Sequence, residues 1–261
     1  MFEINKSNMI KCSYKDKAIM GIAWNGIEKF ASQCISFVIN IVLARLLMPA
    51  DFGLVGTLAI FFAFTELLVG SGFSMALIQK KNRTELDYST VFYFNCMMGL
   101  VLYSLLFFSA PLIAQFFDVR QLTVLTRVLS LNIIINSFSI VLQTRLTILL
   151  DFKTQALISL FSVIISGPLG IFMAYHGFGV WALVFQMLFS SLVRLVSLFY
   201  FNRWLPLLAF KPSSLRRLFA FSSKLLGAGL VATLVNSLYS VLIAKVFAPR
   251  DLRFYTRARQ Y

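Results

Sequence analysis

Long apolar segments dominate this sequence and constrain its fold more than any other feature. They lie at about residues 20–47, 53–78, 89–113, 121–144, 154–175, 179–201 and 218–247. A helix needs about 20 mostly apolar residues to cross the hydrocarbon core of a bilayer. Lipid offers the backbone no hydrogen-bond partners, so each crossing segment must satisfy its own backbone groups as a helix. The sequence therefore predicts an all-α polytopic membrane protein.

Composition agrees with this prediction. Hydrophobic residues make up 59% of the chain and charged residues 13%, whereas soluble domains carry about 25% charged residues. The net charge of +14 would suggest nucleic-acid binding in a soluble protein. Here the basic residues lie mainly between the apolar segments, so we expect no nucleic-acid partner. The three cysteines have no metal-binding spacing, and we expect no metal or cofactor.

The basic residues also predict an orientation. With a cytoplasmic N-terminus, the inner loops contain Lys6, Lys11, Lys15, Lys17, Lys80, Lys81, Arg83, Arg145, Lys153, Arg203, Lys211, Arg216 and Arg217. The outer loops of the first six segments contain Arg45 and Arg120. This excess predicts a cytoplasmic N-terminus. The basic stretch KVFAPRDLRFYTRARQY after the seventh segment would then lie outside, against the rule.

A short repeat links the first and seventh segments. Residues 43–53 read LARLLMPADFG and residues 243–253 read IAKVFAPRDLR. Four positions keep their residue type or charge: Ala44 and Ala244, Arg45 and Lys245, Pro49 and Pro249, Asp51 and Asp251. Both copies end an apolar segment of the same predicted direction. Six segments per repeat indicate two parallel halves related by an axis along the membrane normal.

The residue types of this repeat suit a helix-to-helix hairpin. Proline cannot continue the hydrogen bonding of a helix, so the helix should end near Pro49. Arg45 lies where a cation suits the carbonyl end of that helix, and Asp51 is placed to cap the next one. We interpret Arg45, Pro49 and Asp51, with their counterparts, as a structural hairpin motif, with a transport role as the less favoured alternative.

The expected organisation has four parts. These are a cytoplasmic arm at residues 1–17, a six-helix transmembrane bundle at 18–201, a basic cytoplasmic linker at 202–217, and a seventh helix that begins an incomplete second bundle at 218–261.

Four stretches resemble a known family. They are LARLLMPADFG, ALIQKKN at 76–82, YHGFGVWALVFQ at 175–186 and APRDLRFYTRARQ at 248–260. Together they resemble the bacterial flippases of lipid-linked oligosaccharides, which belong to the multidrug/oligosaccharidyl-lipid/polysaccharide exporter superfamily. The resemblance covers residues 15–261.

This resemblance implies an inner-membrane carrier without enzymatic chemistry. Such carriers move undecaprenyl-diphosphate-linked repeat units to the periplasmic leaflet, for O-antigen, lipopolysaccharide or exopolysaccharide synthesis. They place two six-helix bundles around a polar, often cationic cavity. The implied partners are an anionic lipid-linked oligosaccharide, membrane lipids and the polysaccharide polymerase machinery.

Two features depart from the family pattern. Arg253 stands where the first copy of the repeat has Gly53. The chain also resembles only the first half of a family member plus one helix. We therefore expect a fragment of a longer protein, a truncated gene product, or a chain that pairs with another.

Ionisable residues inside the segments are the candidates for substrate contact, because placing them in lipid is costly. They are Glu28, Lys29, Glu66, Arg127 and Arg194. Arginine suits a diphosphate or an acidic sugar through bidentate hydrogen bonds, so Arg194 and Arg127 are the first choices. Glu66 is an alternative ion or proton site. By counted depth, Glu28 and Arg194 reach the same level and are able to pair.

Purely structural roles remain alternatives to substrate contact for these residues. The charged groups fit interhelix salt bridges or side chains that reach towards the membrane surface. Five amide side chains line either a sugar path or ordinary interhelix contacts: Asn40, Asn95, Asn132, Asn136 and Gln143. Competing functions are a cation-coupled multidrug exporter and a non-functional fragment. A membrane enzyme is disfavoured because the predicted outer loops are short.

Overall fold

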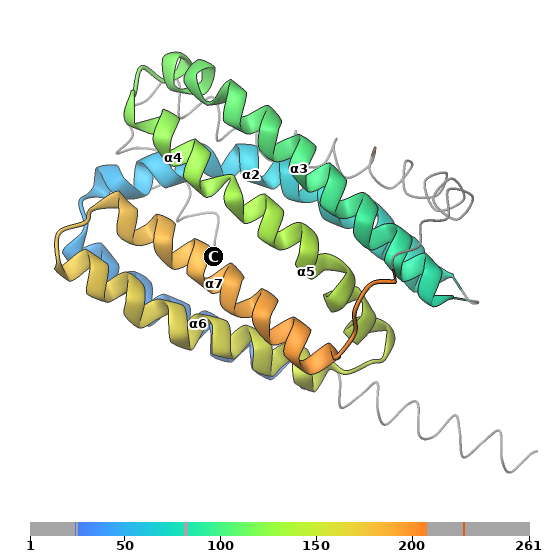
Figure 1. Ribbon diagram of the computed structural model, residues 1–261. Helices are drawn as coiled ribbons and strands as arrows, with labels where there is room; N and C mark the ends of the chain where they lie inside the picture. Colours follow the sequence, from blue (N-terminus) through green and yellow to red (C-terminus); the bar gives the residue numbers. More distant parts are fainter. Residues whose placement is uncertain (1–23, 25, 81–82, 208–226, 228–261) are drawn as a thin grey trace, which may run out of the picture.

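The computed structural model describes residue 24, residues 26–80, residues 83–207 and residue 227. These parts contain helices and turns but no strand. A first helix, Gly26–Leu46, precedes α2 (Pro49–Gln79), α3 (Glu85–Phe116), α4 (Gln121–Leu129), α5 (Leu131–Ile148), α6 (Phe152–Tyr175) and α7 (Val180–Asn202). Figure 1 shows them as long, roughly aligned helices joined by short turns.

The first six predicted segments are confirmed as helices, and α2, α3 and the α4–α5 pair extend beyond the predicted limits. The predicted arm at 1–17, the seventh segment and the second copy of the repeat lie outside the described residues, as does nearly all of the linker. Six described helices are long and apolar enough to cross a membrane. The protein is therefore an all-α polytopic membrane protein.

The fourth predicted segment differs from expectation because it is divided into α4 and α5 at Ser130. Neither proline nor glycine lies there. Instead, the Ser130 hydroxyl donates to the Arg127 carbonyl oxygen at 2.8 Å. In a continuous helix that oxygen would accept the Leu131 N–H. Ser137 makes the equivalent bond to Ile134 inside the unbroken α5, so the hydroxyl alone does not account for the division. Ser130 keeps right-handed helical angles (φ −63°, ψ −19°), and α4 and α5 together form one membrane-spanning segment.

Helix α5 is the centre of the bundle. It packs against α2, α3 and α7, while α6 packs mainly on α7. In an apolar 18-residue stretch of the α4–α5 span 44% of the residues are buried, against 11% in the corresponding stretch of the first helix. The first helix therefore lies at the periphery, behind α6 in the view of Figure 1.

Three apolar clusters hold these helices together. One joins α2, α3, α4 and α7 around Leu58, Leu125 and Val184. A second joins α2, α3, α5 and α7 around Leu77 and Leu142. The third attaches the first helix to α6 and α7 through residues including Ile39, Leu43, Ala174 and Ala182. Together these clusters bury one face of each helix against its neighbours.

Three glycines allow adjacent helices to approach closely. A Cβ atom at Gly99 of α3 would lie 2.6 Å from Ser137 Oγ of α5. A Cβ at Gly170 of α6 would lie 2.8 Å from Gln186 Oε1 of α7. Gly167 of α6 lies against Ile39 of the first helix in the same way. Small residues at such contacts are typical of helix packing in membranes.

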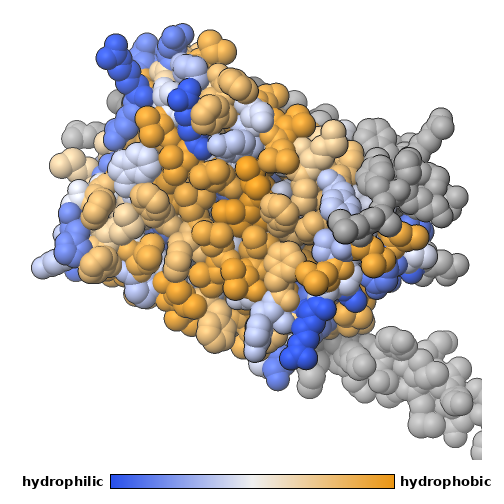
Figure 2. All heavy atoms as spheres, viewed as in Figure 1, coloured by the Kyte–Doolittle hydropathy of each residue, from blue (hydrophilic) through white to orange (hydrophobic). Residues whose placement is uncertain are grey.

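The outer surface is apolar. Figure 2 shows hydrophobic side chains across the middle of the visible face and hydrophilic ones towards the helix ends. Phe108 is 76% exposed, Val196 65% and Phe172 64%. Exposing so large an apolar surface to water is unfavourable, whereas the acyl chains of a bilayer would cover it without that cost.

Candidate functional site

The hairpin motif lies between the first helix and α2. Pro49 is the first residue of α2, where its missing N–H has no consequence. The Asp51 carboxylate accepts the Met48 N–H at 3.1 Å, so it closes the amino end of α2. Arg45 is exposed on the last turn of the preceding helix. The counterparts Lys245, Pro249 and Asp251 lie outside the described residues.

The hairpin between α6 and α7 meets this motif. A Cβ atom at Gly179 would lie 3.6 Å from Asp51 Oδ1, so the two turns are neighbours at one end of the bundle. Gly177 and Gly179 have φ angles of 79° and 56°, which suit glycine. Two stretches of the family resemblance therefore lie side by side.

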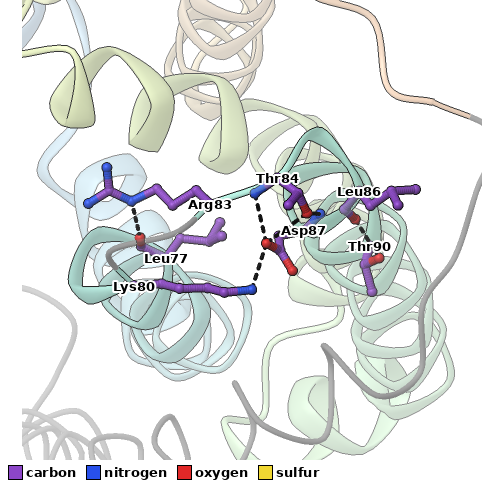
Figure 3. A network of polar contacts seen from close by, with 7 residues as sticks. All are labelled: Leu77, Lys80, Arg83, Thr84, Leu86, Asp87 and Thr90. Carbon is purple, nitrogen blue, oxygen red and sulfur yellow. Dashed lines mark hydrogen bonds and ion pairs between the residues drawn. The ribbon is translucent and has the colours of Figure 1, made fainter.

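A polar network closes the opposite end, between α2 and α3 (Figure 3). Asp87 is 1% exposed, and its carboxylate accepts from Lys80 Nζ at 2.6 Å and from the Thr84 N–H and hydroxyl at 2.9 Å each. Arg83 donates to the carbonyl oxygens of Leu77 at 2.8 Å and Ile78 at 2.6 Å. It thereby caps the last turn of α2.

The end of α7 joins the same region. The Trp204 indole N–H donates to Glu85 Oε2 at 2.6 Å, and Arg145 lies 3.7 Å from Glu85 Oε1. The Arg145 guanidinium also lies 5.5 Å from the centroid of the Trp204 ring. This end carries the described basic loop residues Lys80, Arg83, Arg145, Lys153 and Arg203. The Asp51 end carries Arg45 and Arg120.

A polar cavity of about 210 Å³ lies between α2, α5 and α7, away from both ends. Its lining consists of Glu66, Val69, Ile133, Asn136, Ser139, Ile140, Gln143 and Arg194. Such a group of polar side chains inside a membrane-spanning bundle is costly unless its members pair or serve a function. This cavity is the candidate functional site.

Arg194 is the electrostatic centre of the cavity. Its Nη2 donates to Gln143 Oε1 at 2.8 Å. The carboxylates of Glu66 on α2 and Glu28 on the first helix both interact electrostatically with its guanidinium. Glu66 in turn accepts a long hydrogen bond, 3.4 Å, from Asn136 Nδ2. The structure thus brings three of the predicted residues near one another from three helices, although Glu28 is not among the residues that line the cavity.

Arg127 and Lys29 do not line the cavity either. Arg127 on α4 lies with its guanidinium 4.5 Å from the centroid of the Phe107 ring, and its Nε is buried without a hydrogen-bond partner. Lys29 is exposed on the first helix. Glu28 itself is partly buried and accepts a 3.5 Å hydrogen bond from Ser32.

Sequence analysis missed one cavity residue and gave two others only a secondary place. Ser139 was overlooked, while Asn136 and Gln143 were grouped with other amides. Their spacing carries a signal, because residues 136, 139 and 143 recur at helical intervals and share one face of α5. Among the described residues, no group of three His, Cys, Asp or Glu side chains is arranged to hold a metal ion.

Comparison with known proteins identifies the family. Residues 42–261 match the family described as "Polysaccharide biosynthesis protein". The chain is 30% identical to teichuronic acid biosynthesis protein TuaB of Bacillus subtilis over 94% of this chain and 51% of that protein. It is 25% identical to succinoglycan biosynthesis transport protein ExoT of Rhizobium meliloti over 92% of this chain and 49% of that protein.

A third relative is lipopolysaccharide biosynthesis protein WzxC of Escherichia coli, at 23% identity over 90% of this chain and 48% of that protein. The chain spans about half the length of these curated relatives. No solved structure matches it. The family match covers most of the chain, and the resemblance noted from its motifs is confirmed: this chain belongs to the polysaccharide biosynthesis protein family, and one of its relatives is named as a transport protein.

Proposed function

We propose that this chain takes part in moving undecaprenyl-diphosphate-linked oligosaccharide repeat units to the periplasmic leaflet of the bacterial inner membrane. The family match and the relative named as a succinoglycan transport protein support a transport role. The proposed partners are the anionic lipid-linked oligosaccharide, membrane lipids and a polysaccharide polymerase that uses the delivered units.

The cavity around Arg194 is the observation that carries this proposal. It lies within helices that are long and apolar enough to cross a membrane, and it contains Glu66, Asn136, Gln143 and Arg194. A purely structural bundle would gain little from a partly open polar cavity at this depth, because unpaired polar groups are costly there. A hydrophilic substrate that crosses the bilayer needs such groups along its path.

The proposed orientation places the N-terminus in the cytoplasm. The end of the bundle with Lys80, Arg83 and Arg145 carries more basic residues than the end with Arg45 and Arg120. Loops rich in lysine and arginine favour the cytoplasmic side. The cavity would then lie between the two leaflets, with the Glu85 end facing the cytoplasm.

The chain's length relative to its relatives leads to a further part of the proposal. It spans about half of their length, and transporters made of two repeats bind substrate between the repeats. We assign to this bundle one wall of such a path. Glu28, Glu66 and Arg194 are the residues proposed to face it, while Arg127 and Lys29 stay as predictions from the sequence.

Replacement of Arg194 by Gln in the source bacterium tests the function. We expect surface polysaccharide to fall about tenfold, because the change removes a charge-assisted hydrogen bond and leaves two carboxylates uncompensated. Lipid-linked intermediates should accumulate in the cytoplasmic leaflet. The matched control is Arg120→Gln, which changes an exposed arginine at a helix end and should leave export intact.

The measurement combines surface polysaccharide, lipid-linked intermediates and membrane abundance of each variant. Deletion of the whole coding sequence provides the reference for complete loss. Normal export after deletion would contradict the proposed function. Normal export by Arg194→Gln at normal abundance would exclude Arg194 from the path.

A further inference from the structure

Four polar residues of α5 form one continuous stripe. Asn132, Asn136, Ser139 and Gln143 follow one another at intervals of three or four residues, which places them on one face of the helix. The last three line the cavity. Asn132 Oδ1 is buried without a hydrogen-bond partner. All four side chains are uncharged, so the stripe offers hydrogen bonds and no net charge.

Charges around the cavity do not favour a polyanion. Arg194 is the cationic residue in the cavity lining, and Glu66 is the residue with a carboxylate in the lining. Glu28 is a second carboxylate whose field reaches Arg194. One guanidinium with two carboxylates in its surroundings gives the site no surplus positive charge, so a diphosphate would be repelled at least as strongly as it is attracted.

The hydrogen-bonding groups instead match sugar hydroxyls. Arg194 holds Gln143 Oε1, which leaves the Gln143 amide N–H groups as donors for a ligand. The Ser139 hydroxyl donates to the Ile135 carbonyl and keeps its oxygen as an acceptor. Asn136 offers both a donor and an acceptor beyond its long bond to Glu66. A hydroxyl both donates and accepts, so neighbouring sugar hydroxyls complement such a mixed set.

The size and the apolar lining of the cavity also favour a sugar as its occupant. At about 30 Å³ for each water-sized group, a cavity of about 210 Å³ holds the equivalent of one sugar ring rather than an oligosaccharide. Val69, Ile133 and Ile140 complete its wall and suit the C–H face of a ring. Ligand sites commonly combine such an apolar lining with a few placed polar groups.

We propose that this cavity is a subsite for one uncharged sugar residue of the transported glycan, recognised through its hydroxyls by the α5 stripe and Glu66. Arg194 positions the Gln143 amide and balances the carboxylates, and the diphosphate of the carrier lipid binds elsewhere. This inference rests on the proposed function, because the transported glycan supplies the sugar.

Binding of soluble probes to the purified full chain in detergent tests the subsite. The probes are a panel of neutral methyl glycosides with gluco, galacto, manno and rhamno configuration, and inorganic pyrophosphate. Saturation-transfer NMR should detect at least one glycoside. Asn136→Leu and Gln143→Leu should each weaken its binding about tenfold, because each removes an amide able to form two hydrogen bonds.

Two further variants control for misfolding. Ile140→Trp keeps every polar group but fills the cavity, and it should abolish glycoside binding. Gln33→Leu makes the matched amide-to-leucine change at an exposed position of the first helix and should leave binding unchanged. Circular dichroism should show equal helix content in all variants that are compared.

Two results would overturn the proposal. One is that no glycoside binds the wild-type chain. The other is that pyrophosphate binds and loses its binding in Arg194→Gln. The proposed function fails separately: if a glycoside binds through Asn136 but deletion leaves export normal, the subsite stands and the transport assignment does not. If deletion abolishes export but no glycoside binds the chain, the transport assignment stands and the subsite does not.

Discussion

The bundle contains two polar regions that differ in how completely their groups are paired. At the α2–α3 end, Asp87 accepts three hydrogen bonds of 2.9 Å or less from Lys80 and Thr84. In the central cavity, Glu66 accepts one bond of 3.4 Å from Asn136. The Asp87 carboxylate is therefore well paired, whereas the cavity retains hydrogen-bonding capacity.

The origin of the partners differs as well. The partners Asp87, Thr84 and Lys80 lie within eight residues of one another and form a local network. The cavity unites residues such as Glu66, Gln143 and Arg194 from distant parts of the chain. A local, saturated network stabilises one conformation, while an unsaturated group from several helices is suited to accept a ligand. Changes in the two regions should therefore affect different quantities.

The largest loss of stability is expected from Asp87→Ala. The change leaves Lys80 and the Thr84 N–H without their acceptor in a largely buried place, so the free energy of unfolding should fall by about 2–3 kcal/mol. Circular dichroism during titration of the purified protein with SDS measures this fall. Asp87→Asn keeps an acceptor and should lose less. If Asp87→Ala lowered the free energy of unfolding less than the cavity variants do, the contrast between the two polar regions would be contradicted.

Trp204→Phe should have a smaller effect at the same end. It removes the indole N–H that donates to Glu85 and keeps an aromatic ring near Arg145. One hydrogen bond to a carboxylate contributes about 1.5–3 kcal/mol to stability. The Glu85 carboxylate is exposed, so a bond to water replaces the lost one and recovers part of this free energy. We expect a loss of about 1 kcal/mol in the same titration. Trp204→Leu, which also removes the ring, should lose more.

Asn136→Leu should change stability least, although it lies deeper in the bundle. Its bond to Glu66 is long, and leucine has a similar size, so the free energy of unfolding should stay within about 1 kcal/mol of the wild type. Glycoside binding should nevertheless weaken about tenfold. A destabilisation as large as that of Asp87→Ala would mean that the cavity groups are structural and would remove the contrast between the regions.

The helices were predictable because hydropathy depends on composition along the chain, and all six described spans follow it. The division at Ser130 was not predictable in this way. The Ser130 hydroxyl bonds the Arg127 carbonyl, but Ser137 makes the equivalent bond to Ile134 within the unbroken α5, so a serine does not mark the division. Local bonding of this kind has no distinct sequence signal.

The cavity was predictable in part. Counting residues from the helix ends placed Glu28 and Arg194 at one depth, and the field of Glu28 acts on Arg194, although their direct pairing stays a prediction. Depth alone does not tell which way a helix faces. The meeting of Glu66 with Arg194, and the separation of Arg127 from both, depend on how α2, α4 and α7 are rotated about their axes. Packing against α5 sets those rotations.

The three glycine contacts have a consequence for how access to the cavity can change. Sliding one helix along its neighbour would bring Ile39 or Ser137 against a side chain larger than the hydrogen of Gly167 or Gly99. Displacements between these helices are therefore sterically blocked, so we expect the bundle to reorient in the bilayer as one block. Spin labels on the first helix and α6 should then keep a single, narrow distance distribution with and without substrate.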